Sequence, residues 1–471
     1  MLLVSSPLFH SVNMPHDATP EKLRIAIVGG GIGGLTLASA LNHHGGDNPS
    51  FEVDLYEGES IISEIGAGIN LWPRTWEVMG SLGLAEELRP FLTGPLDDTP
   101  RTVFRVHKAD QPRGIFIRDI VMKGGAARFH RGDLQQVLLR HLRGRLHLSH
   151  RLISFEEHED EVRLYFMNGT VAVCDVLIGM DGIRSVVRRG FLQRQGFLKS
   201  PSVDPIWTGT IAYRGMIAKE TLEAVYPNHR AATEPMLYVG KLKHLIVYQV
   251  TKSEHTLINI AAFVTDPAEE GTRLPGSPSM PCSQREMLAP FEGWDNEVQA
   301  LLNCIEKPTK WLIRHLYPLE RYASGRVILC GDAAHAMSPH HGAGAGQAIE
   351  DAYVLSSLLC HDLASKDTIP QIAEIYNAIR YPQGNKTLLG SDQAGKQTQL
   401  VAPGFEDVRE GDADVPLEKL QDLFEDFARR WDWVWKESAE GDRSLALQLF
   451  KSPETFQRPR PYSACMLSGR L

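Results

Sequence analysis

The chain has 471 residues, of which 43% are hydrophobic and 23% are charged, and its formal net charge is −9. These values are typical of a globular protein, and an acidic balance without any basic run argues against nucleic acid as a partner. The six cysteines include no Cys-x-x-Cys pair, which argues against a disulfide framework and against a zinc or other metal site.

Residues 1–20 carry no basic segment and only a short apolar run, so we expect a disordered leader and not a signal peptide. No stretch approaches the ~20 apolar residues that a membrane-spanning helix needs. We therefore expect a soluble, cytoplasmic protein. The sequence does not indicate the oligomeric state.

A glycine-rich turn separates the first predicted strand, residues 23–28, from a helix that begins near residue 36. Gly29, Gly31 and Gly34 fit the pattern G-x-G-x-x-G. In this pattern the first glycine permits the turn, the second lets the backbone approach a pyrophosphate, and the third lets the helix pack on the strand. The turn therefore predicts a dinucleotide site, without distinguishing FAD from NAD.

The next predicted strand, residues 51–56, ends in Glu57, where a carboxylate is expected on the ribose hydroxyls of the dinucleotide. A second glycine-rich stretch follows and contains Ala67 and Gly68. A loop of this kind at the carboxyl end of a sheet commonly lies along a ligand. Beyond a helix over 73–82, the charged residues 97–110 indicate an irregular connection.

The central part of the chain alternates between short strands and helices. A helix opens just after Arg131, and residues 151–173 indicate a hairpin with its turn at Asn168-Gly169. A strand over 176–178 then runs into Asp181-Gly182. This placement predicts a second contact with the pyrophosphate region.

Residues 206–217, 244–251 and 256–265 are rich in β-branched and alternating residues, which indicates the antiparallel strands of a separate sheet. Arg214 and Tyr248 lie on these strands. The residues that follow, 266–282, indicate a loop.

The nucleotide fold resumes late in the chain. A strand ends in Gly331-Asp332, and a glycine-rich turn over 342–347 opens a helix over 348–361. Three tryptophans lie close together in the helical C-terminal part: Trp431, Trp433 and Trp435. We interpret them as packing residues or as a face for a partner, in preference to part of a functional site.

Three stretches in this order, 29–34, Asp181-Gly182 and Gly331-Asp332, resemble those of the flavin-dependent aromatic hydroxylases, the single-component FAD monooxygenases of the p-hydroxybenzoate hydroxylase fold. The resemblance runs from about residue 23 to about residue 389. Within the family, the chain is most similar to fungal salicylate-hydroxylase-like proteins and to monooxygenases of polyketide-derived phenols. The resemblance thus implies aromatic catabolism or secondary metabolism in a fungus.

The resemblance implies an α/β fold with a Rossmann-type FAD-binding domain, a β-sheet substrate domain and a C-terminal helical region. The expected division is a leader over 1–20, an FAD-binding domain over 21–190 and 296–390, a substrate domain over 191–295 and a helical region over 391–471.

The resemblance also assigns cofactor contacts. It implies that Glu57 holds the adenosine ribose, Arg131 contacts FAD, Asp181 serves the pyrophosphate and the passing nicotinamide, and Asp332 bonds the ribityl chain. The expected cofactor-binding residues are Gly29, Gly31, Gly34, Glu57, Ala67, Gly68, Arg131, Asp181, Asp332, Gly344 and Ala345.

The family reaction has two halves: NADPH or NADH reduces FAD, and dioxygen then forms a flavin C4a-hydroperoxide that passes OH to an electron-rich ring. Only one dinucleotide fingerprint is present, which suits transient binding of the nicotinamide cofactor. Arg214 and Tyr248 are the candidate catalytic residues, since an arginine lowers the pKa of a bound phenol and a tyrosine donates to its oxygen.

Other interpretations stay open at this point. Arg214 could form a salt bridge and Tyr248 could be a core aromatic residue. For His335, His340 and His341, we expect structural roles in preference to a role as general base. Two other functions also remain: the same flavin chemistry on a non-aromatic alkene, or a flavin-binding module without catalysis.

Overall fold

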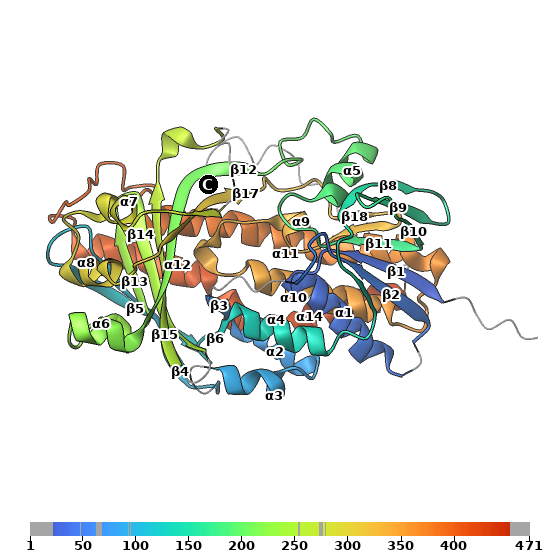
Figure 1. Cartoon of the computed structure of the whole chain (residues 1–471), viewed down its shortest axis with the longest axis horizontal. Coiled ribbons are helices and arrows are strands. Elements are labelled where there is room, and N and C mark those ends of the chain that lie inside the picture. The colour runs from blue at the N-terminus through green and yellow to red at the C-terminus, as the bar shows by residue number, and fades with distance from the viewer. Residues whose placement is uncertain are drawn as a thin grey trace, which may run out of the picture.

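Two β-sheets dominate the computed structural model, one towards each end of the molecule (Figure 1). The structure describes residues 22–452 except 48, 63–67, 93, 95, 253–254, 273–276 and 278. The expected cofactor residue Ala67 lies outside the described residues.

The first sheet has six strands in the order β18-β19-β11-β1-β2-β7, and β1 pairs in parallel with both β2 and β11. The glycine turn after β1 leads into α1 (Ile32–Gly45), which packs against α10 (Gly344–Leu359). This arrangement confirms the predicted Rossmann-type α/β unit. Its strands are β1 (Leu23–Val28), β2 (Phe51–Tyr56), β7 (Arg145–His147), β11 (Val176–Gly179), β18 (Ala323–Ser324) and β19 (Val327–Leu329).

The second sheet has eight strands in the order β16-β17-β12-β15-β14-β13-β4-β5. Adjacent strands in this sheet are antiparallel, except that β13 and β4 are parallel. Its strands are β4 (Pro100–Lys108), β5 (Ile115–Lys123), β12 (Ile206–Ala218), β13 (Met236–Gly240), β14 (Lys243–Lys252), β15 (His255–Thr265), β16 (Ser279–Pro281) and β17 (Thr309–His315).

The expectation of an irregular connection over 97–110 is wrong, because β4 is a nine-residue strand that pairs with β5 and β13. Its charges were misleading. Lys108 is fully buried and its ammonium group lies 2.5 Å from a carboxylate oxygen of the buried Asp110. A charge that is paired in this way can lie inside a sheet.

The two faces of the second sheet are covered differently, because successive side chains of a strand point to opposite faces. On β14, Leu245 and Val247 pack with α6 (Lys219–Val225), α7 (Gln284–Leu288) and α8 (Asn296–Asn303). On the other face, Tyr248 and Val250 join a cluster with the C-terminal helix α12 (Leu417–Trp431). The second face is the one that carries the large cavity.

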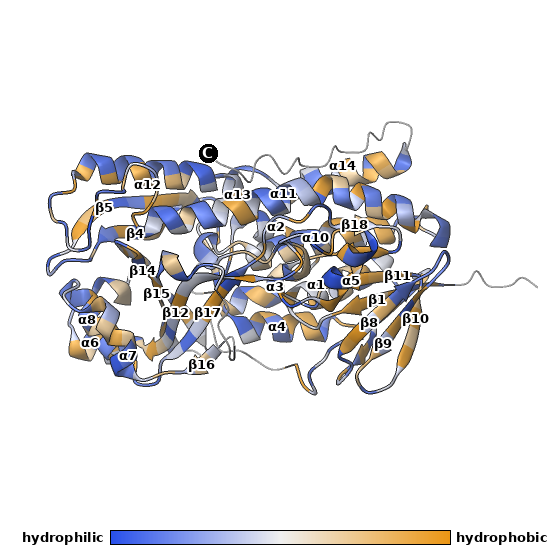
Figure 2. Cartoon of the chain, turned by 90° about the horizontal axis from the view of Figure 1, so that it is seen from above, coloured by the Kyte–Doolittle hydropathy of each residue, from blue (hydrophilic) through white to orange (hydrophobic). Residues whose placement is uncertain are grey.

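Helix α12 presents an apolar stripe to β4 and β5, and Figure 2 shows it running beside these strands. The residues of the stripe, Leu420, Phe424, Phe427 and Trp431, follow the three-and-four spacing of one helix face. Helix α11 (Ile369–Thr398) contacts both α10 and α12.

Smaller elements complete the described fold. A three-stranded sheet, β8 to β10, includes the predicted turn at Asn168-Gly169, and β3 pairs with β6. These elements are β3 (Gly68–Leu71), α2 (Pro73–Ser81), α3 (Ala85–Leu88), β6 (Ala127–His130), α4 (Arg131–Arg140), β8 (Leu152–Glu157), β9 (Val162–Phe166), β10 (Val171–Cys174), α5 (Val186–Arg194), α9 (Asp332–His335), α13 (Trp433–Lys436) and α14 (Ala439–Lys451).

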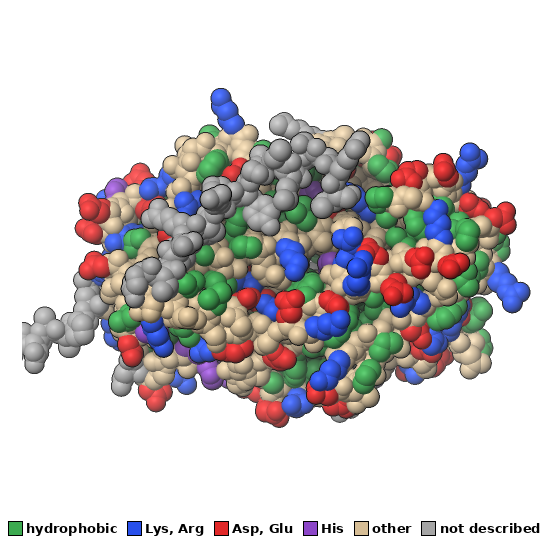
Figure 3. Space-filling model, turned by 180° about the vertical axis from the view of Figure 1, so that it is seen from behind, with side chains coloured by type: hydrophobic (Ala, Val, Ile, Leu, Met, Phe, Trp, Pro, Cys, Tyr) green, Lys and Arg blue, Asp and Glu red, His purple; other side chains and the backbone are tan. Residues whose placement is uncertain are grey.

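The surface carries charges of both signs. In Figure 3, basic and acidic side chains alternate over the coloured part of that face without a large area of either sign. Among the described residues, no helix combines the length and the apolar character that crossing a membrane requires.

Candidate cofactor and substrate site

A cavity of about 490 Å³ lies between the two sheets. One side is formed by the glycine turn after β1, by Gly331-Asp332 and by the residues that open α10. The other side is formed by side chains of β12, β14, β15 and β17. A cavity of this size, where a nucleotide-type fold meets a second sheet, is suited to a small-molecule ligand.

The three glycines of the first turn have different surroundings. A Cβ atom on Gly29 would lie 2.1 Å from the carbonyl oxygen of Met180, and one on Gly34 would lie 1.9 Å from that of Gly29. Gly31 borders the cavity and has open space where a Cβ would project. The first and third glycines therefore allow close packing of the chain, while the second leaves room for a ligand to approach the backbone.

Glu57 is fixed at the end of β2 beside this turn. One carboxylate oxygen accepts a hydrogen bond of 2.8 Å from the N–H of Gly30, and the other accepts one of 2.8 Å from the N–H of Glu59. The carboxylate thus lies next to the turn, although it does not border the cavity itself.

Asp181 is occupied by the helix that follows it. Its carboxylate accepts hydrogen bonds from the Ser185 hydroxyl (2.5 Å) and from the N–H groups of Val186 (2.7 Å) and Val187 (3.1 Å) at the start of α5. The cavity is bordered by the neighbouring Gly182, whose φ is +78°. The structure therefore brings the backbone of the Asp-Gly pair to the cavity, and uses the aspartate side chain as a helix cap.

The second aspartate turn lies directly on the cavity. Gly331 adopts a φ of +56° and Asp332 is exposed towards the cavity. Gly344 and Ala345 also border it, because α10 begins at Gly344 and not at the expected residue 348. The free N–H groups and positive dipole end of this 16-residue helix are therefore available to an anionic group in the cavity.

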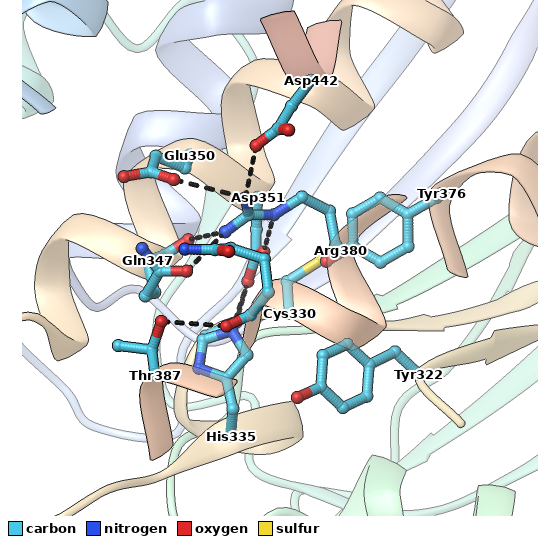
Figure 4. A network of polar contacts seen from close by, with 12 residues as sticks. Tyr322, Cys330, His335, Gln347, Glu350, Asp351, Tyr376, Arg380, Thr387 and Asp442 are labelled. Atoms are coloured by element: carbon cyan, nitrogen blue, oxygen red, sulfur yellow. Dashed lines mark hydrogen bonds and ion pairs between the residues drawn. The ribbon is translucent and has the colours of Figure 1, made fainter. Parts of the chain in front are cut away.

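A buried polar network around Asp351 and Arg380, shown in Figure 4, supports the Gly331 turn. One oxygen of Asp351 accepts hydrogen bonds from the Gly331 N–H (2.8 Å) and from His335 Nε2 (2.7 Å), and its other oxygen accepts one from Arg380 Nε (2.7 Å). Although burial opposes ionisation, His335 and Arg380 lower the pKa of Asp351 to about 2. His335 therefore has the structural role expected for it.

The same network reaches the C-terminal helix α14. The guanidinium of Arg380 also contacts Glu350 (3.2 Å) and Asp442 (3.3 Å), and Arg74 bridges the same two carboxylates at 3.1 and 2.5 Å. Both arginines are buried. Helices α2, α10, α11 and α14 are thereby tied together behind the cavity.

Gly68 and Arg131 lie at the remaining edge of the cavity. The Gly68 N–H donates to Asn259 Oδ1 of β15 at 3.2 Å, and a Cβ at Gly68 would lie 2.8 Å from the Tyr248 hydroxyl. This contact brings the second glycine loop against the second sheet. Arg131 is the first residue of α4 and its side chain is exposed towards the cavity.

Arg214 and Tyr248 both border the cavity, from strands on either side of β15. Burial lowers the pKa of Arg214, and no carboxylate among the described residues pairs with it. Burial raises the pKa of Tyr248 against the opposing charges of Arg214 and Arg128, so the phenol is a neutral hydrogen-bond donor near neutral pH. The pair therefore offers one positive charge and one hydroxyl to a ligand.

Two histidines and two tryptophans complete the wall of the cavity. Burial lowers the pKa of His340 to about 4 and that of His341 to about 3, so both are neutral at neutral pH. Trp72 and Trp431 also border the cavity. The sequence analysis missed this role of Trp431, because nothing in the spacing of the C-terminal tryptophans indicates which of them reaches the site.

These features fit a flavin dinucleotide. Gly31 leaves space for a pyrophosphate, Asp332 offers a carboxylate for hydroxyl groups, and the start of α10 offers N–H groups to an electron-rich ring edge. Arg214 and Tyr248 then remain for a second, smaller ligand.

Comparison with known proteins agrees with this fit. A family described as "FAD binding domain" matches residues 22–202 and 296–389. The chain is 34% identical to a salicylate hydroxylase of Pseudomonas putida over 434 residues, which cover 90% of this chain and 94% of that enzyme. It is 31% identical to a 6-methylsalicylate 1-monooxygenase of Aspergillus terreus, over 91% of this chain and 93% of that one.

A solved structure shares the whole arrangement. The structure described as a salicylate hydroxylase substrate complex aligns with a TM-score of 0.77 and 30% sequence identity. The alignment covers 93% of this chain and 99% of that one. Both sheets and the C-terminal helices therefore have counterparts in an aromatic hydroxylase.

Proposed function

The chain belongs to the FAD-dependent aromatic hydroxylases, an FAD-binding family of monooxygenases, and we propose that its substrate is a phenol that carries an acidic group. NAD(P)H is the proposed reductant and dioxygen the proposed oxidant. The salicylate and methylsalicylate named for two relatives support this substrate class. A role in secondary metabolism or aromatic catabolism is consistent with these relatives.

The observation that carries the proposal is the charge of Arg214 beside the Tyr248 hydroxyl on the cavity wall, which no carboxylate among the described residues pairs with. The Arg214 side chain is half-buried and its Nε atom is fully buried, and a charge held there without a carboxylate is costly unless a ligand compensates it. An anionic oxygen of the substrate would pair with Arg214, and Tyr248 would donate a hydrogen bond to the phenolic oxygen. Both contacts favour the ionised phenol, which is the form most reactive at its ortho carbon.

FAD, when bound, would supply the oxygen-transfer chemistry of the proposed reaction. The residues of this chain hold the reactants. We propose that the backbone at Gly31 and Gly182 receives the pyrophosphate, that Asp332 binds the ribityl chain, and that the N–H groups at Gly344 and Ala345 stabilise negative charge on the reduced ring. Glu57 and Arg131 are the proposed contacts of the adenosine half and of the cofactor edge.

The test is stopped-flow reduction of the flavin by NADPH and by NADH, with salicylate, methylsalicylates and larger phenols added in turn. The proposal expects one class of phenolic acid to accelerate reduction and to yield a hydroxylated product. A reduction rate that is the same with every phenol, and no hydroxylated product, would overturn it.

A further inference from the structure

Three aromatic rings from distant segments stack along one wall of the cavity. The ring of Trp431 in α12 lies 6.1 Å from that of Phe104 at 11°, and 5.6 Å from that of His341 at 6°. Trp72 meets Trp431 edge-on, with centroids 4.5 Å apart. All four residues border the cavity, so together they form its aromatic wall.

The two tryptophans of this wall are held in different ways. The indole N–H of Trp72 lies 3.1 Å from the carbonyl oxygens of both His341 and Gly342, so Trp72 fixes the turn that leads to α10. The indole N–H of Trp431 has no hydrogen-bond partner among the described residues. Among the described residues, the Trp431 indole is therefore held by packing contacts and not by a hydrogen bond, and only 1% of the residue's surface is exposed.

Trp431 lies between the cavity and the hydrophobic cluster that α12 forms with the second sheet. Its neighbours on the same helix face, Phe424 and Phe427, are buried against the second sheet and do not border the cavity. The indole is thus the last group of α12 before the cavity begins. Shortening this side chain would join its volume to the cavity, because surrounding groups collapse only partly into such a space.

We propose that Trp431 is a specificity-determining residue, whose indole limits the length of the ring substituent that the site accepts. This inference rests on the proposed function and narrows its substrate class to phenolic acids with short substituents on the side that faces α12. The C-terminal helix then selects the substrate, while Arg214 and Tyr248 orient it.

The experiment compares Trp431→Leu and Trp431→Ala with the wild-type holoenzyme on salicylate and on its methyl, ethyl and propyl derivatives at each free ring position. Two quantities are measured: kcat/KM for hydroxylation, and Kd from the change in flavin absorbance on binding. For each variant, the value for a propyl salicylate is divided by the value for salicylate itself, which gives a propyl-to-parent ratio for kcat/KM and for affinity. Each buried methylene is worth about four-fold in affinity, so we expect both ratios to rise by tens-fold when the propyl group is at one particular ring position.

Phe424→Leu is the matched control. It shortens an aromatic residue on the same face of α12 without reaching the cavity, and it is expected to leave the propyl-to-parent ratio within about two-fold of wild type. A ratio that rises equally in this variant would attribute the effect to loosening of the helix and would overturn the inference. If Trp431→Ala does not fold, Trp431→Leu alone decides.

The outcomes separate the two proposals. Unchanged ratios in folded, FAD-containing Trp431 variants, together with hydroxylation of salicylate by wild type, would overturn the role of Trp431 and leave the proposed function intact. If the wild-type enzyme neither binds nor hydroxylates any of these phenols, the proposed function fails and this inference fails with it.

Discussion

The guanidinium carbon of Arg214 lies 5.2 Å from the centre of the Trp311 indole. The two residues lie diagonally across the paired strands β12 and β17, because Trp311 is opposite Ala212 and Arg214 is opposite Thr309. A cation is attracted to the face of an indole without being neutralised by it. The ring therefore fixes the guanidinium while its charge remains available to a ligand in the cavity.

Replacing Arg214 by Ala is expected to leave FAD bound and to impair hydroxylation. The loss of a charge-assisted contact corresponds to about 1.5–3 kcal/mol, or roughly 10- to 150-fold in kcat/KM. We also expect NADPH consumption to continue with release of hydrogen peroxide, because the substrate is no longer held for oxygen transfer. Product yield per NADPH is the measurement.

Arg214→Lys is the matched variant for this prediction. It retains the charge but not the planar group that stacks on Trp311, so its product yield should lie between those of wild type and Arg214→Ala. A normal yield from Arg214→Ala would remove Arg214 from the site.

Asp332→Ala should purify largely without flavin. The carboxylate lies on the cavity at the turn after β19, where it is placed to accept hydrogen bonds from cofactor hydroxyl groups. The ratio of flavin to protein absorbance measures occupancy, and Asp332→Asn, which keeps one oxygen acceptor, should retain more FAD than Asp332→Ala. A fully yellow Asp332→Ala protein contradicts the assignment.

Local motifs account for what the sequence predicts well. The turn between β1 and α1 could be predicted because Gly29 and Gly34 must be glycines for neighbouring segments to approach, whatever the rest of the fold does. The strands that carry Arg214 and Tyr248 could be predicted because their side chains alternate between a buried face and a cavity face.

Contacts between distant segments could not be predicted in this way. Strand β4 was missed because it pairs with a distant strand: Arg105 lies opposite Met236 of β13, more than a hundred residues away. Its charged residues also suggested an exposed segment, although the ion pair of Lys108 with Asp110 is buried. The place of Trp431 depends on how α12 docks on the sheet. Asp351 falls within the predicted helix over 348–361, but no local pattern indicates that it holds the Gly331 turn, which lies twenty residues away.

Asp351→Asn is expected to destabilise the protein and weaken FAD binding together. The Asp351 carboxylate accepts hydrogen bonds from three donors, and the amide of asparagine would turn its own N–H groups towards one of them. The substitution would also leave the charge of Arg380 poorly compensated. Breaking a buried pair of this kind costs about 3–5 kcal/mol in the free energy of unfolding. Urea unfolding and FAD titration measure the two effects.

Asp442→Asn provides the comparison. Asp442 contacts the same arginine, but its side chain is 31% exposed and water can replace part of the interaction. We expect a smaller loss of stability than for Asp351→Asn and little change in FAD affinity. Equal effects from the two variants would show that the network does not specifically support the Gly331 turn.

The buried histidines of the cavity wall should make stability fall in acid. His340 and His341 have folded-state pKa values of about 4 and about 3, against 6.5 when unfolded. Between these limits the unfolded chain binds more protons, so the free energy of unfolding decreases as pH falls below 6.5, by about 1.4 kcal/mol per pH unit for each histidine. Urea unfolding at pH 7.5 and 5.5 tests this, and His341→Gln should reduce the difference, whereas replacing the exposed His158 by Gln should not. An unchanged difference in His341→Gln would mean that His341 takes up no proton on unfolding.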